Sequence, residues 1–375
     1  MLTTGYVEST TAGKGVISLT TDQAFSYVGT GSTLVGQATA TNATTLNLVA
    51  PSITLNSGTL TALGDGSTAL SVTANGGAGS GGINATINGD ILSAAGPAVV
   101  LNSTAVAGTQ NVVLTSTAGN DITSGAGTAV TISTAGSGSV NVNLAGAVTA
   151  TSGIGVLITN TASSAGVSVT TGAVTASDSG IDVQSQSTAG GVTIVTNGAV
   201  AGGTGFGVLA TTAGSGLVHV TNNGGVSSST GGPGISAVNF GSGSVLVDGN
   251  GAITGGSVAG SNLFARTTGG GNITITGNGV ISGGGSNGIL ASATGGNGNV
   301  SITRGGTVSG EIGINASALG TGTIGVTTIG AGSTITSTAG DGVQTTAVDG
   351  LTTINLAGAV NATGGDGIDA SATGT

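Results

Sequence analysis

Short stretches in which aliphatic and polar residues alternate recur along this chain at a step of about 26 residues. One series of aliphatic residues shows the step clearly. Its members are Ile91, Ile122, Val148, Val174, Val200, Val226, Ile253, Ile281, Val308, Ile335 and Val360. A unit of this length cannot bury its own apolar face, and it becomes stable only when it stacks on copies of itself. The period therefore predicts a solenoid.

Each unit holds three alternating stretches, and alternation at period two is typical of a half-buried strand. The series above belongs to the second stretch. The first stretch contains Val142, Val169, Ile194, Val220, Val247, Ile275, Ile302, Val326 and Ile354. The third stretch contains Ile154, Ile181, Phe206, Ile235, Leu263, Ile289, Ile314, Val343 and Ile368. Three short strands per coil predict an all-β fold, a parallel β-helix or β-solenoid, and parallel crossovers predict that it winds right-handed.

The repeat also sets the expected domain boundaries. We predict an irregular start or partial cap over residues 1–45 and a β-helix over 46–375 that is most regular from residue 83. The pattern is still running where the sequence stops, so we expect a truncated C-terminus. The corner between the second and third stretches varies in length and is longest at 227–234 and 254–262. Variable loops on a regular scaffold often carry function, so we expect any local site at this corner.

Composition and charge exclude several classes of protein. The 375 residues include 78 Gly but only 3 Pro, with no strict Gly at every third position, which argues against collagen. A mean hydropathy of +0.44 argues against disorder. The chain has only 3 Lys and Arg residues but 13 Asp and Glu residues, so we expect no nucleic-acid partner. The chain has no Cys for disulfides or zinc thiolates, and no apolar run long enough to make it membrane-spanning.

Two groups of units carry a family resemblance. VNVNLAGAVTATSGIGVLIT (140–159) and INLAGAVNATGGDGIDASAT (354–373) resemble the passenger regions of bacterial autotransporters, and the likeness covers about residues 83–375. LNLVAPSITLNSG (46–58) is similar to repeats of two-partner secreted, filamentous-haemagglutinin-like exoproteins. Both resemblances imply a right-handed β-helix at the bacterial cell surface or secreted from it. The first implies attachment to an outer-membrane β-barrel in the full-length protein, and the second implies a separate transporter.

Few residues offer site chemistry. His219 is the only histidine, and Asp248 lies diagonally from it, so we interpret His219 as a solvated surface residue and not as part of a catalytic triad. Asp90 and Asp121 precede Ile91 and Ile122 in adjacent coils, where two stacked carboxylates are weak candidates for binding Ca²⁺. Solvated carboxylates that repel weakly are the preferred interpretation.

One surface spot is a candidate contact. Phe264 and Leu290 take equivalent outward places in consecutive coils, next to the loop at 254–262. Arg266 lies two residues along the strand and would suit an acidic glycan. Ordinary scatter of apolar residues on a surface is the alternative.

The sequence therefore predicts a structural stalk or adhesin-like passenger segment, not an enzyme, that needs no cofactor and contacts a host-surface or extracellular glycan or protein. A polysaccharide-active β-helix enzyme is the alternative, but it would require clustered acids with basic residues beside them. An ice-binding β-solenoid is a more distant alternative. Among the outward pairs that flank the first series, only Thr274 and Thr276 offer two threonines.

Overall fold

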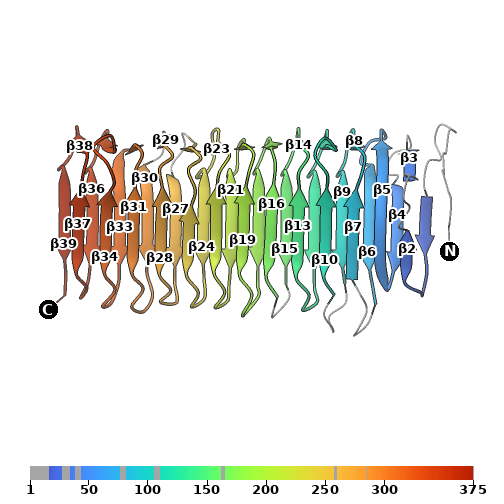
Figure 1. Cartoon of the computed structure of the whole chain (residues 1–375), viewed down its shortest axis with the longest axis horizontal. Helices are drawn as coiled ribbons and strands as arrows, with labels where there is room; N and C mark the ends of the chain where they lie inside the picture. The colour runs from blue at the N-terminus through green and yellow to red at the C-terminus, as the bar shows by residue number, and fades with distance from the viewer. Residues whose placement is uncertain are drawn as a thin grey trace. The chain divides into compact units, whose positions relative to one another are not determined.

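The described residues of the computed structural model form parallel strands that stack coil upon coil within each part of the chain (Figure 1). The structure describes residues 17–27, 34–38, 44–76, 82–104, 110–161, 165–256, 260–284 and 286–374. They divide into two compact units, Met1–Ser187 and Thr188–Thr375, which are treated separately below. Each unit is a parallel β-solenoid with coils of about 27 residues, which confirms the all-β fold class and the repeat. Right-handed winding stays a prediction.

In the unit Met1–Ser187, each regular coil contributes three strands. The first strands are β2 (Phe25–Tyr27), β5 (Ser52–Ala62), β7 (Gly82–Ile87), β10 (Val112–Ser116), β13 (Val140–Leu144) and β16 (Val167–Thr171). The second strands are β3 (Leu34–Ala38), β8 (Ile91–Ser93), β11 (Ile122–Ser124), β14 (Val148–Ala150) and β17 (Val174–Ala176). The third strands are β1 (Ile17–Thr20), β4 (Thr44–Ala50), β6 (Thr68–Ala74), β9 (Val99–Ser103), β12 (Val130–Thr134), β15 (Val156–Asn160) and β18 (Ile181–Ser185). Strand β5 is long enough to pair with both β7 and β8, so it serves as first and second strand of its coil.

The unit Thr188–Thr375 repeats the same arrangement. Its first strands are β19 (Val192–Thr196), β22 (Val218–Asn222), β25 (Val245–Asp248), β28 (Ile273–Gly277), β31 (Val300–Arg304), β34 (Ile324–Thr328) and β37 (Thr352–Leu356). Its second strands are β20 (Val200–Gly202), β23 (Val226–Ser228), β26 (Ile253–Gly255), β29 (Ile281–Gly283), β32 (Val308–Gly310), β35 (Thr334–Ser337) and β38 (Ala359–Ala362). Its third strands are β21 (Val208–Thr212), β24 (Ile235–Asn239), β27 (Ser261–Thr267), β30 (Asn287–Ala293), β33 (Ile312–Ala318), β36 (Val343–Ala347) and β39 (Ile368–Ala372).

The core of each unit contains columns of aliphatic residues that stack from coil to coil. Val220 pairs in register with Val247, and Ile302 pairs with Ile275 and Val326. Side chains alternate along strands such as β22 and β31, so the inward residues are buried and their outward neighbours reach solvent. Within each unit the first and second series of aliphatic residues stand in register as the sequence predicts.

The third column corrects two assignments. Val156 pairs with Ile181, and Val208 pairs with Ile235, so neither Ile154 nor Phe206 belongs to the column. Each of the two replacements stands two residues further along the chain, because the preceding corner is two residues longer than expected. Phe206 is half-buried in that corner, whereas Val208 is fully buried.

The strands described within the first 45 residues already stack on strands of the following coils. Strand β1 pairs in parallel with β4, and β2 and β3 pair with β5. The rest of the predicted irregular start, residues 1–16, 28–33 and 39–43, lies outside the described residues. Among the residues that the structure does describe, no helix has the length and apolar character needed to cross a membrane.

Candidate functional site

A groove of about 500 Å³ lies on the outward face of the third strands in the unit Thr188–Thr375. Nine residues from four successive coils line it. They are Phe206, Pro233, Ser236, Gly260, Ser261, Phe264, Ser286, Asn287 and Leu290. The groove therefore forms at the variable corner where the sequence predicts a local site. Residues 257–259 of the loop 254–262 lie outside the described residues.

The floor of the groove follows from strand alternation. Leu263 and Ala265 of β27 point into the core of the solenoid, so Phe264 between them points outward. In register it stands between Ser236 of β24 and Leu290 of β30. Because the Ser236 side chain is small, it leaves space beside the ring of Phe264, and this space is part of the groove. The structure thus places Phe264 and Leu290 side by side, and their role as a contact surface stays a prediction.

The wall of the groove comes from the corners before β21 and β24, which supply Phe206 and Pro233. Gly232 packs against the ring of Phe206, and a Cβ at this glycine would lie 2.9 Å from two ring carbons. Only glycine allows the corner before β24 to lie this close to the aromatic ring. Phe206, wrongly assigned to the core from the sequence, is thereby held at the surface as part of the groove.

The remaining lining is polar and uncharged. The Nδ2 of Asn287 donates long hydrogen bonds to Ser261 Oγ at 3.3 Å and to Ser286 Oγ at 3.4 Å. The Oδ1 of Asn287 is buried and has no hydrogen-bond partner among the described residues. The groove therefore combines aromatic and aliphatic surface with hydroxyl and amide groups that retain hydrogen-bonding capacity.

Arg266 lies beside the groove and does not line it. It stands two residues along β27 on the same outward face, between Val238 and Ser292 of the neighbouring strands. Val238 is only 5% exposed, and the Nε of Arg266 is buried without a hydrogen-bond partner among the described residues. The side chain is thus partly embedded in the sheet surface next to the groove.

Asp90 and Asp121 have structural partners in the following coil. Asp90 Oδ1 accepts a hydrogen bond from the backbone N–H of Asp121 at 3.0 Å, and Asp121 Oδ1 accepts one from the N–H of Ala147 at 2.9 Å. The backbone N–H of Ile91 donates in turn to the carbonyl of Asp121. Within the described ranges there is no group of three or more His, Cys, Asp and Glu residues that could hold a metal ion.

The same contact recurs along both units, and we call it the side-chain ladder. In each case an Asp or Asn in the turn before a strand accepts a backbone N–H from the corresponding turn of the next coil. The acceptors are Asp90, Asn111, Asp121, Asn250, Asn272, Asn297, Asn299 and Asp341. The ladder satisfies donors just outside the strands, where the regular parallel pairing does not reach.

Substitution of Asp90 tests whether the ladder or a bound metal explains this carboxylate. We expect Asp90→Ala to lower the free energy of unfolding by up to about 1 kcal/mol, because the N–H of Asp121 loses its acceptor. Asp90→Asn keeps an acceptor oxygen, so its free energy of unfolding is expected to be close to that of the parent chain. Urea titrations with and without Ca²⁺ measure both effects. A clear Ca²⁺-dependent stabilisation that both variants lose would restore the metal site.

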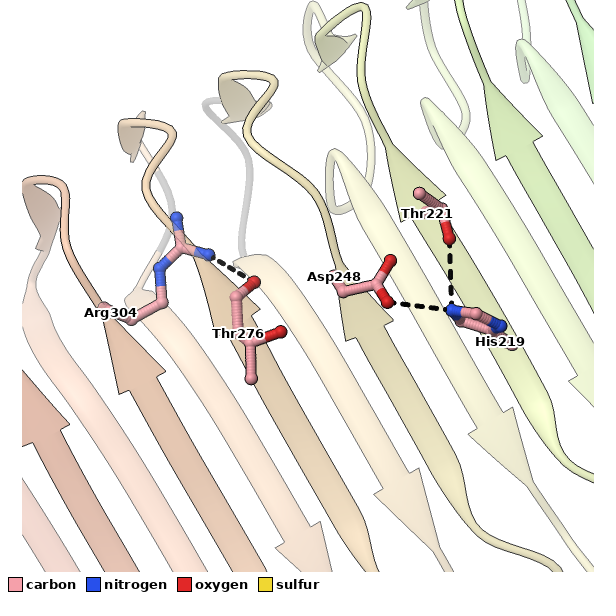
Figure 2. A network of polar contacts seen from close by, with 5 residues as sticks. All are labelled: His219, Thr221, Asp248, Thr276 and Arg304. Atoms are coloured by element: carbon pink, nitrogen blue, oxygen red, sulfur yellow. Dashed lines mark hydrogen bonds and ion pairs between the residues drawn. The ribbon is translucent and has the colours of Figure 1, made fainter.

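His219 makes a contact that the sequence analysis missed. Its Nε2 lies 3.0 Å from Asp248 Oδ2 and 3.1 Å from Thr221 Oγ1 (Figure 2). The strands place Asp248 opposite Thr221, diagonally from His219 as predicted, but the diagonal is short enough for a hydrogen bond. A catalytic triad needs the carboxylate on one ring nitrogen and the nucleophile on the other. Here both partners lie on the same nitrogen, so the arrangement is not that of a triad.

Arg304 is a buried charge inside the solenoid. Its side chain is 2% exposed and points inward at the end of β31, where Nη1 donates to the carbonyl of Thr276 at 2.9 Å (Figure 2). Its Nη2 donates to the carbonyl of Gly279. Gly277 leaves the space, since a Cβ there would lie 3.0 Å from Nη1. Burial lowers the pKa of Arg304 to about 10. Alternation from Ile302 places Arg304 inward, so the sequence held this signal.

Asp182 is a second buried ionisable group, on the outward face of β18 in the unit Met1–Ser187. The Nε2 of Gln184 donates to both of its carboxylate oxygens, at 3.1 and 3.2 Å. Desolvation raises the pKa of Asp182, the hydrogen bond from Gln184 lowers it, and the charge of Asp178 raises it again, with a net upward shift. The folded state therefore disfavours the charged carboxylate.

Replacement of Asp182 by Asn is expected to raise the free energy of unfolding at pH 7. The raised pKa means that the folded state binds its proton more tightly than the unfolded state does. The penalty is fully present above the folded pKa, shrinks as the pH falls through that value, and vanishes below the unfolded value of 3.8. Urea titrations of both chains at several pH values measure the difference. A difference that is constant or grows toward acid would contradict this assignment.

Comparison of the chain with protein-family models, with curated proteins and with solved structures gave no match. The assignment of a function therefore relies on the geometry of the described residues. Their ionisable side chains are spread over many coils, and the hydrogen bond between His219 and Asp248 does not have the layout of a catalytic centre. The groove is the place where several side chains converge on one concave surface.

Proposed function

We propose that this chain is a non-catalytic structural stalk or adhesin-like passenger segment, displayed at the bacterial cell surface or secreted. The observation that supports this most is the uniform stacking of coils in register within each unit. A scaffold of this kind holds loops and outward faces in fixed positions, and contacts with a partner then form on those surfaces.

The mechanism is mechanical and repetitive. Burial of one inward Val or Ile side chain stabilises the fold by roughly 1.5–3 kcal/mol, and each coil repeats this contribution. Columns such as Val220 with Val247, or Ile302 with Val326, continue through the coils of a unit. The outward residues are a mixture of polar and apolar side chains, and exposed apolar residues such as Phe240 and Leu351 lie outside the groove. The groove gathers several apolar side chains on one concave surface.

The resemblance of the segments 140–159 and 354–373 to autotransporter passengers supports export through an outer-membrane transporter. The resemblance of 46–58 to two-partner secreted exoproteins supports the same destination with a separate transporter. Under either route, the partner of this segment is a glycan or protein outside the cell.

Antibody labelling of the cells that produce the chain tests its location. We expect labelling of intact cells, or recovery of the chain from the culture medium, and loss of the surface signal after brief protease treatment. Labelling that requires permeabilised cells would overturn surface display. Assays of the purified chain for glycan cleavage, with and without Ca²⁺, test the absence of catalysis. Cleavage that Asp90→Asn and Asp121→Asn abolish would establish an enzyme instead.

A further inference from the structure

We infer that the groove over β24, β27 and β30 binds a neutral saccharide, with the ring of Phe264 as the stacking platform. This inference rests on the proposed function and names the ligand class of its contact surface. Pyranose rings present a face of C–H groups and a rim of hydroxyls. The groove offers surface of both kinds, with Phe264 and Leu290 in register on adjacent strands and polar side chains around them.

The apolar part of the groove lining suits the C–H face of a sugar. The ring of Phe264 points outward from the sheet, and Phe206 and Pro233 rise from the corners beside it. An aromatic face carries partial negative charge, which attracts the polarised C–H groups of a sugar ring in addition to burying them. A half-exposed aromatic side chain between Ser236 and Leu290 gives such a ring a flat place to stack.

The smaller, polar part of the lining suits the hydroxyl rim. Ser261, Ser286 and Asn287 contribute hydroxyl and amide groups along one side of the groove. Their mutual hydrogen bonds are long, at 3.3 and 3.4 Å, and the Oδ1 of Asn287 has no partner within the described ranges. A small rotation of the Asn287 side chain would present an acceptor and two donors to a ligand, which is how amides recognise vicinal hydroxyls.

Charge and strand pairing disfavour other ligands. None of the nine lining residues is charged, which disfavours an ionic ligand in the groove itself. An added peptide strand needs a free strand edge, but β27 already pairs with β24 and β30, and β30 also pairs with β33. A ligand must therefore be recognised by side chains. The volume of about 500 Å³ falls in the range of small-molecule sites.

Titration with defined sugars tests the inference on the full chain. The probes are the methyl glycosides of glucose, galactose, mannose and N-acetylglucosamine, the disaccharides maltose, cellobiose and lactose, and sialyllactose as an acidic probe. We expect at least one neutral probe to bind with a dissociation constant in the millimolar range or tighter, measured by calorimetry. No neutral binding at that concentration would overturn the inference.

Matched variants separate the groove from the rest of the surface. Phe264→Ala and Phe264→Leu are expected to weaken binding of the neutral probe at least about tenfold. Phe264→Leu keeps an apolar side chain and removes only the aromatic face, so it tests stacking without a cavity. Phe240, which is 56% exposed and outside the groove, provides the control Phe240→Ala, which we expect to leave binding unchanged. Unchanged thermal unfolding of the variants confirms that they fold.

Two further outcomes would contradict the inference, and two others separate it from the proposed function. Equal loss with Phe240→Ala would indicate general stickiness of exposed rings. Binding of sialyllactose alone, lost in Arg266→Gln, would assign the site to an acidic glycan and to Arg266. Cleavage of a bound probe would preserve the site but overturn the proposed non-catalytic function, whereas surface labelling without sugar binding would leave that function standing.

Discussion

Ile302→Asp is expected to prevent stable folding of the coils around β31. Ile302 is fully buried and pairs in register with Ile275 and Val326, so the new carboxylate would lie in an aliphatic column without a partner. The lost apolar burial amounts to roughly 1.5–3 kcal/mol, and an unpaired buried carboxylate adds several kcal/mol more. A domain of ordinary stability has a free energy of unfolding of about 5–15 kcal/mol, so these two losses together remove most of it.

Circular dichroism in urea and limited proteolysis measure this effect. Thr303→Asp is the matched control, because Thr303 follows Ile302 on the outward side of the same strand. We expect the control to stay within about 1 kcal/mol of the parent chain. If the two aspartates destabilised the chain equally, the inward columns would not be what holds the coils together.

Arg304→Ala is expected to lower the free energy of unfolding by about 3–5 kcal/mol. The substitution opens a cavity above Gly277 and leaves the carbonyls of Thr276 and Gly279 without their donors. Removal of a buried charge offsets part of this loss. The lowered pKa means that the folded state disfavours the charged form, a penalty present at every pH below about 10. The loss should therefore be flat between about pH 6 and 9.

Arg304→Met distinguishes packing from hydrogen bonding. Leu144 occupies the equivalent corner in the unit Met1–Ser187 and is fully buried, so this corner accepts an apolar side chain. We expect Met to recover about half of the loss seen with Ala by filling the space. Urea titrations of the three chains give the comparison. A methionine variant as unstable as the alanine variant would assign the whole effect to the two carbonyls.

Much of the fold is predictable because the alternation of side chains has a strict period. Residues such as Val220 and Ile302 follow from it, since a strand residue points either inward or outward. Register in the third column was harder to predict. Phe206 and Val208 both satisfy the alternation, and only the length of the corner decides which one stacks on Ile235. Corner length is a property of the loop and leaves no mark on the apolar period.

The candidate site was predictable only in part. Outward placement of Phe264 and Leu290 follows from alternation, and the long corners at 227–234 and 254–262 pointed to the same region. The groove also needs Phe206 as a wall, which depends on the corner that misled the register. The hydrogen bond between His219 and Asp248 depends on side-chain reach across a diagonal, which strand position alone does not fix.

The side-chain ladder gives each unit a built-in polarity. Every Asp and Asn in it reaches forward, from its own coil to an N–H of the coil that follows in the chain. A coil that has already folded therefore presents a ready set of acceptors to the segment that comes after it. A coil on the C-terminal side presents the matching backbone donors. The two faces of a coil are therefore chemically different, and a coil stacked in the reverse order would not form this contact.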